Sequence, residues 1–154
     1  MQVIIKQYTL FILLILSLVG CKSGRQSKSD LPPIVMFEKT ECFGTCPSYV
    51  FKAYPDGRAT YTGRKYVDLI GEYATSLSKA QLDSLRNLFE EAGYFKFANV
   101  YSANIEDRPT VYLYYDNGRQ NAKVTDYYGA PQRLKELEQA VEAFIFGLDW
   151  QPRQ

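Results

Sequence analysis

The segment Ser48–Tyr54 constrains the fold of this chain more than any other feature, because its side chains alternate in character as they do in a half-buried strand. One side of such a strand would carry Tyr49, Phe51 and Ala53, and the other side would carry Val50, Lys52 and Tyr54. The next residues, Pro55-Asp56-Gly57, favour a turn because proline presets φ and glycine accepts a positive φ. Arg58–Thr62 would then return antiparallel to the first strand.

The order of the remaining elements predicts the fold class. Further strands are expected at residues 34–39, 70–75, 110–115 and 120–125, the last two around Asp116-Asn117-Gly118. A capping box of Ser78 and Gln81 begins one helix, Gly93 ends it, and a second helix begins near Pro131. We therefore predict an α+β fold, an antiparallel sheet of about five to six strands with two helices packed on one face.

The N-terminal segment resembles an export signal. Lys6 precedes twelve uncharged residues, Tyr8–Val19, which is short of the about 20 residues that a membrane span requires. The sequence Leu18-Val19-Gly20-Cys21 then resembles a lipobox, at which bacterial lipoproteins are cleaved and acylated on the cysteine. An ordinary signal peptide and an uncleaved anchor are the alternatives. We predict a signal peptide over 1–20, lipid on Cys21, a flexible polar tether to residue 33 and a single domain over 34–150.

Cleavage after Gly20 would leave 134 residues that carry no formal net charge. Lys6 is the only charged residue removed, so 17 basic residues remain against 17 acidic ones. Without a basic excess we expect no nucleic-acid partner. In some bacteria, acidic residues directly after the lipidated cysteine resemble a sorting signal for the cell surface. Cys21 is followed directly by Lys22-Ser23-Gly24, so this signal is missing. We therefore expect anchoring in the outer membrane, facing the periplasm.

Cys42 and Cys46 form the second notable feature. If Cys21 carries lipid, they remain as a pair, and export permits a disulfide between them, with Gly44 allowing the sharp turn. A ring this small stabilises the fold by only about 2 kcal/mol in the loop-entropy treatment. Two alternatives stay open, namely a redox dithiol and a Cu(I) site of two thiolates.

The absence of histidine from the whole chain excludes the usual forms of several catalytic sites. It removes Ser-His-Asp and Cys-His catalysis and the zinc sites that contain histidine. The sequence also has no glycine-rich phosphate loop. We therefore expect no catalytic residues, no metal and no cofactor, and a domain that binds or scaffolds without being an enzyme. A thiol redox or Cu(I)-handling protein that uses Cys42 and Cys46 is the alternative.

The chain is rich in tyrosine, with 13 residues, and this suggests a binding face on the sheet. If Val111, Leu113 and Tyr115 face the helices, their neighbours lie on the opposite face. The candidate binding face consists of Lys52, Tyr54, Thr60, Thr62, Tyr112 and Tyr114. Exposed tyrosines there would suit a glycan or an extended peptide, since each offers a rigid ring with a polar tip. Alternatively, Tyr and Thr simply suit half-exposed strands.

The octapeptide Cys42–Tyr49, with Asp56-Gly57 and Tyr61-Thr62-Gly63, resembles the signature of a bacterial lipoprotein family, domain-of-unknown-function family 6438. The resemblance is most specific from Ile34 to the first expected helix and extends more loosely to the second hairpin. It implies export with a lipid anchor, and it brings no activity, substrate or catalytic residue.

The lipobox generates the first prediction. Replacing Cys21 with alanine removes the acylated thiol, so the Cys21→Ala protein should lose its membrane association or accumulate with its leader uncleaved. Fractionation of cells that express the full chain, followed by mass determination, measures both effects. Normal processing and full membrane retention of the variant would contradict lipidation at this residue.

Overall fold

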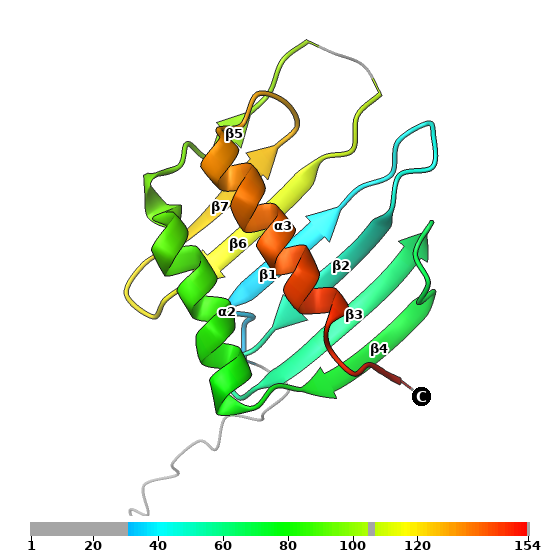
Figure 1. Cartoon of the computed structure of the whole chain (residues 1–154), viewed down its shortest axis with the longest axis vertical. Coiled ribbons are helices and arrows are strands. Elements are labelled where there is room, and N and C mark those ends of the chain that lie inside the picture. The colour runs from blue at the N-terminus through cyan, green and yellow to red at the C-terminus, as the bar shows by residue number, and fades with distance from the viewer. Residues whose placement is uncertain (1–30, 105–106, 154) are drawn as a thin grey trace, which may run out of the picture. The chain divides into compact units, whose positions relative to one another are not determined.

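The computed structural model describes residues 31–104 and 107–153 (Figure 1). The predicted signal peptide, Cys21 and nearly all of the tether lie outside these residues. The elements in chain order are β1 (Val35–Lys39), β2 (Ser48–Ala53), β3 (Arg58–Lys65), β4 (Gly71–Ser76), α2 (Lys79–Ala92), the 3₁₀ helix η2 (Tyr94–Lys96), β5 (Val100–Tyr101), β6 (Val111–Asp116), β7 (Asn121–Asp126), α3 (Gln132–Phe146) and β8 (Gln151–Pro152).

All the described strands belong to one sheet, in the order β5-β7-β6-β1-β2-β3-β4-β8. The first strand of the chain lies in the middle, where β1 pairs with β2 on one side and with β6 on the other. Each predicted hairpin therefore has β1 as its inner neighbour. Every pairing is antiparallel except that of β5 with β7.

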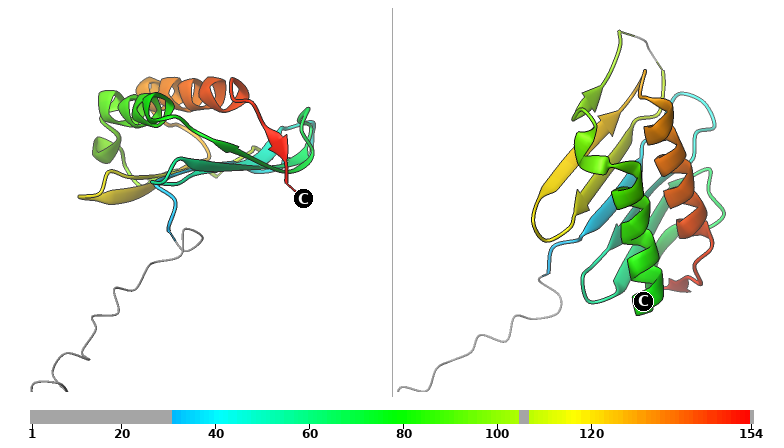
Figure 2. Two further views of the ribbon diagram at one scale, coloured as in Figure 1. Left: turned by 90° about the horizontal axis from the view of Figure 1, so that it is seen from below. Right: turned by 60° about the vertical axis from the view of Figure 1, so that its left-hand side comes forward.

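The predicted fold class is confirmed, but the strand count is wrong. The structure is α+β, and both helices lie on the same face of the sheet (Figure 2). The described sheet has eight strands instead of five to six. The two additional strands, β5 and β8, have two residues each, and so short a segment leaves no alternation to recognise.

The core lies between the sheet and the two helices. The apolar side of the first hairpin is as predicted, since Tyr49, Phe51 and Ala53 are all fully buried. Alternate residues of β6 are buried in the same way, which places their neighbours on the uncovered face. The helix residues that cover this side of the sheet are Leu82, Leu85 and Phe89 of α2 and Leu134, Leu137, Val141 and Ile145 of α3.

The helix ends agree closely with the local sequence. The Ser78 hydroxyl accepts a hydrogen bond from the backbone N–H of Gln81 at 3.2 Å, and the Ser78 N–H donates to the Gln81 side chain at 2.9 Å. This is the predicted capping box. Gly93 ends α2 with a φ of 69°, a left-handed conformation that glycine adopts readily. The second helix begins at Gln132, and Pro131 is its extended N-cap residue instead of its first helical residue.

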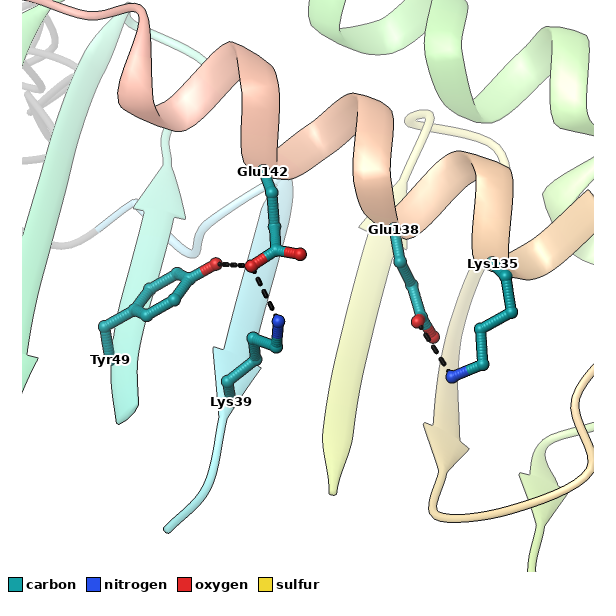
Figure 3. A network of polar contacts seen from close by, with 5 residues as sticks. All are labelled: Lys39, Tyr49, Lys135, Glu138 and Glu142. Carbon is teal, nitrogen blue, oxygen red and sulfur yellow. Dashed lines mark hydrogen bonds and ion pairs between the residues drawn. The ribbon is translucent and has the colours of Figure 1, made fainter. Parts of the chain in front are cut away.

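Three charged side chains meet beneath the N-terminal half of α3, two of which are drawn in Figure 3. Glu138 is 5% exposed and Asp126 only 1%, and Lys135 forms ion pairs with both, the contact with Glu138 being 3.1 Å. One lysine thus serves two buried carboxyl groups. Burial, together with the neighbouring Asp126, raises the pKa of Glu138 to about 7.

This shift generates a prediction for stability against pH. The folded protein holds the Glu138 proton more tightly than the unfolded chain does, whose glutamate has a pKa of 4.5. The contribution of Glu138 to the free energy of unfolding is therefore largest below about pH 4.5 and falls as the pH rises through 7. Glutamine resembles the protonated carboxyl, so Glu138→Gln should reduce the loss of stability between about pH 5 and about pH 8, by up to about 3 kcal/mol.

Urea unfolding of both proteins at the two pH values measures the difference, and Glu136→Gln, at an exposed position of the same helix, is the matched control. An identical pH dependence in Glu138→Gln and wild type would contradict the assignment of the raised pKa to this residue.

Candidate functional site

The helices cover one face of the sheet and leave the other uncovered, which we call the open face (Figure 2). The register across β1 joins the outward sides of the two hairpins on this face. Met36 lies between Lys52 of β2 and Tyr114 of β6, and Glu38 lies beside Tyr112. The candidate binding residues therefore share one continuous surface that runs over four adjacent strands.

All six residues of the candidate binding face are partly exposed, and none is fully exposed. The Lys123 ammonium lies over the Tyr112 ring, 4.5 Å from its centroid. Burial and the nearby Asp116 carboxylate raise the pKa of Tyr114. Both tyrosines are thus held against neighbouring strand residues, and they are less accessible than a free aromatic platform would be.

Four of the six residues come together in a groove of about 290 Å³ on the open face, which we call the open-face groove. Its polar lining consists mainly of Lys52, Tyr54, Thr60, Thr62, Arg64, Glu72 and Arg153. Tyr112 and Tyr114 do not line it, because β1 and its outward side chains stand between β6 and β2. The structure therefore concentrates the candidate site on the first hairpin.

The charge balance of the open-face groove is positive. Lys52, Arg64 and Arg153 line it, against the single carboxylate of Glu72. Arg64 donates to the Glu38 carboxylate at 2.9 Å, whereas the side chains of Lys52 and Arg153 form no ion pair with any described residue. Such a groove favours an anionic ligand, since guanidinium and ammonium groups donate charge-assisted hydrogen bonds to carboxylates and phosphates.

The prediction from sequence missed both arginines. Arg64 lies beyond Thr62, where the return strand was expected to end, whereas β3 continues to Lys65. Arg153 follows β8, and its backbone N–H donates to the carbonyl of Glu72 at 2.9 Å. That contact brings the end of the described chain to the rim of the groove, and only the tertiary structure reveals it.

Cys42 and Cys46 are joined by the predicted disulfide, with their Cα atoms 5.7 Å apart. Both cysteines are half-exposed, and Phe43 between them is 96% exposed. The backbone N–H of Phe43 donates to Asp107 Oδ1 at 2.6 Å, which attaches the loop to a distant segment. The disulfide therefore shapes an exposed loop and does not brace the core.

A polar network on the helix side of the sheet was not predicted (Figure 3). Glu142 Oε1 accepts a hydrogen bond from the Tyr49 hydroxyl at 2.6 Å and another from the Lys39 ammonium at 2.8 Å. Burial and the Glu142 carboxylate both raise the pKa of Tyr49. The one sequence signal was the spacing of Glu138, Glu142 and Ile145, which puts both glutamates at the border of the apolar stripe of α3.

Other kinds of site are not found in the part of the chain that the structure describes. Over residues 31–104 and 107–153 there is no cluster of three His, Cys, Asp or Glu side chains placed to hold a metal ion. Within the same residues no helix is long and apolar enough to cross a membrane.

Comparison with models of protein families identified a family. A family model described as "Domain of unknown function (DUF6438)" matches residues 33–145. No curated protein matches the chain. The matched range contains β1 to β7 and nearly all of α3, so it includes most of the open-face groove but ends before Arg153.

Proposed function

The chain belongs to the family described as domain of unknown function DUF6438, and on that premise we propose that it is an exported, lipid-anchored protein whose open face binds an acidic glycan without catalysing a reaction. The family match supports no activity by itself. The proposal combines the lipobox-like sequence before Cys21 with the chemistry of the open-face groove. The lining and the positive charge of the open-face groove are its main support.

The open-face groove offers the groups that an acidic sugar chain requires. The hydroxyls of Thr60 and Thr62 can donate to and accept from sugar hydroxyls. The ring of Tyr54 provides a rigid apolar surface at the rim, where the Arg58 guanidinium lies 4.5 Å from its centroid. Lys52 and Arg153 can each bind a carboxylate of the ligand. A neutral sugar would leave these two cations without partners.

A glycan on the face suits this sheet better than a peptide added at its edge. Peptides that extend a sheet pair with a long edge strand through backbone hydrogen bonds. Here the outer edges of β7 and β4 are each partly covered by a two-residue strand, β5 or β8, which shortens the run that is available for such pairing. The open face, by contrast, spans all the long strands.

The predicted anchor supports an envelope role for this groove. Lipid on Cys21 would tether the domain to the outer membrane through the polar segment that ends at Pro33. The groove would then meet ligands near the membrane surface. Envelope glycans that carry carboxylates or phosphates have the charge that the groove complements.

A thiol redox or Cu(I) role for the cysteine pair is the second candidate. The observation that favours it is the partial exposure of both Cys42 and Cys46 in a loop outside the core. An easily reduced pair, with a reduction potential in the range of catalytic dithiols, would support this role over the purely structural one.

Charge reversal in the groove tests the proposed function. The double variant Lys52→Glu with Arg153→Glu should bind an oligogalacturonate at least about tenfold more weakly than the wild type, because two attractive contacts become repulsive. Calorimetric titration of the purified domain at low salt measures the affinity. A neutral oligoglucan of equal length serves as the second ligand and should bind weakly to both proteins.

The matched control is Lys79→Glu with Lys96→Glu, which changes the net charge equally at two exposed positions of α2 and η2. Its affinity should stay near that of the wild type. Equal weakening in both double variants would show a long-range charge effect only. Equal binding of the acidic and neutral chains by the wild type would contradict the proposal.

A further inference from the structure

A second groove, of about 540 Å³, lies on the other side of the sheet, beside the C-terminal end of α3. We call it the α3 groove. Phe146 and Trp150 form its wall on the helix side, and Tyr66 and Asp68 line it from the connection between β3 and β4. The volume is within the range of about 300–1,000 Å³ that is typical of pockets for small molecules. Tyr61 lines both grooves, but their charged lining residues are different.

A close backbone approach builds the wall that contains Tyr66 and Asp68. The connection between β3 and β4 folds back over Gly63, so that a Cβ at this position would stand 1.7 Å from the carbonyl oxygen of Leu69. Only glycine fits there. Tyr66 adopts a φ of 54°, a left-handed conformation that is unusual for a bulky residue. The strained connection presents the Tyr66 ring, which is 57% exposed, at the groove.

A buried hydroxyl of the α3 groove has no hydrogen-bond partner among the residues that the structure describes. The Tyr61 side chain is 1% exposed, and its ring packs 5.4 Å from that of Tyr49 and 5.5 Å from that of Trp150. Its hydroxyl forms no hydrogen bond with any described residue. Buried hydroxyls in proteins nearly always have a partner, and an unsatisfied one in a pocket wall indicates a missing polar group.

The charges at the α3 groove select for a cation. Asp68 and Glu142 are its charged lining residues, and both are carboxylates. Lys39 offsets Glu142, whereas Asp68 forms no ion pair with any described residue. Burial and the charge of Asp68 raise the pKa of Tyr61 to about 12, so its hydroxyl is neutral and its oxygen can accept a hydrogen bond. The aromatic walls add attraction, since ring faces favour cations.

We propose that the α3 groove binds a small organic cation, an ammonium group on an aromatic or aliphatic body. The body packs against Phe146 and Trp150, the ammonium pairs with the Asp68 carboxylate, and one of its N–H groups donates to the Tyr61 hydroxyl oxygen. This site is separate from the open-face groove, and it does not require the glycan proposal to hold.

Trp150 provides the readout, because it is the only tryptophan of the chain and it lines the α3 groove. Three probes that share a phenyl body differ in head group: 2-phenylethylammonium, 2-phenylethanol and 3-phenylpropanoate. Titration of the mature protein with 2-phenylethylammonium should change the Trp150 fluorescence saturably. Its affinity should exceed that of 3-phenylpropanoate by at least about tenfold, with the alcohol between them.

Two variants assign the contacts. Asp68→Asn, at an exposed position, should leave the fold intact and reduce the affinity for 2-phenylethylammonium to about that for 2-phenylethanol. Tyr61→Phe should weaken the ammonium probe while its thermal unfolding stays near that of the wild type, since the removed hydroxyl has no partner to lose. The control is Glu136→Gln, at an exposed position of α3 outside the groove. It removes one negative charge and should leave the affinity for 2-phenylethylammonium unchanged.

Three outcomes would overturn the proposal: no saturable response of Trp150 to the ammonium probe, equal affinity for the ammonium and carboxylate probes, or unchanged ammonium binding in Asp68→Asn. Because Asp68 lines the α3 groove and does not line the open-face groove, such a failure would leave the glycan proposal standing.

Discussion

The hydrogen bonds that converge on Glu142 Oε1 join α3 to β1 and β2, the two central strands of the sheet. Tyr49 of β2 and Lys39 of β1 donate to this one oxygen from residues that are 93 and 103 positions away in the chain. Hydrogen bonds to an ionised carboxylate are about twice as strong as neutral ones, and low exposure strengthens them further. They fix the C-terminal half of α3 over the two central strands. Phe146 and Trp150 follow Glu142 in the chain and line the α3 groove together with it.

The position of β1 explains why the two faces of the sheet differ so strongly. As a central strand, β1 joins the two hairpins into a single sheet. Both α2 and α3 cover the same side of this sheet (Figure 2). On the covered side, the Tyr49 ring stacks between the rings of Phe37 and Tyr61. The open side carries cations and hydroxyls from the same strands. Alternation along β2 and β3 thus produces two chemically opposite surfaces.

Much of this arrangement follows from local sequence. The alternation of Ser48–Tyr54 predicted which side chains of β2 are buried, and the capping box predicted where α2 begins. These features are encoded within a few residues of one another, so one segment is enough to recognise them. The resemblance to the DUF6438 family was drawn from Cys42–Tyr49, Asp56-Gly57 and Tyr61-Thr62-Gly63, and the match of the family model to residues 33–145 confirms the family.

The functional features that escaped prediction all depend on contacts between distant segments. Their spacing places Glu138 and Glu142 at the border of the apolar stripe of α3, but their partners Asp126, Lys39 and Tyr49 come from distant strands. Four residues of the candidate binding face line the open-face groove, whereas Tyr112 and Tyr114 lie across β1 from it. Arg153 reaches the groove through a two-residue strand that has no recognisable pattern.

A double-mutant cycle on Tyr49 and Glu142 tests most directly whether this bond holds α3 to the sheet. Tyr49→Phe, Glu142→Ala and the combined variant would be unfolded with urea alongside the wild type. If the hydrogen bond holds α3 to the sheet, the coupling energy should be about 1–3 kcal/mol, so that the combined variant is less destabilised than the two single effects together. Single effects that add to within about 0.5 kcal/mol would show that the two residues act independently, and would contradict the central role given to their contact.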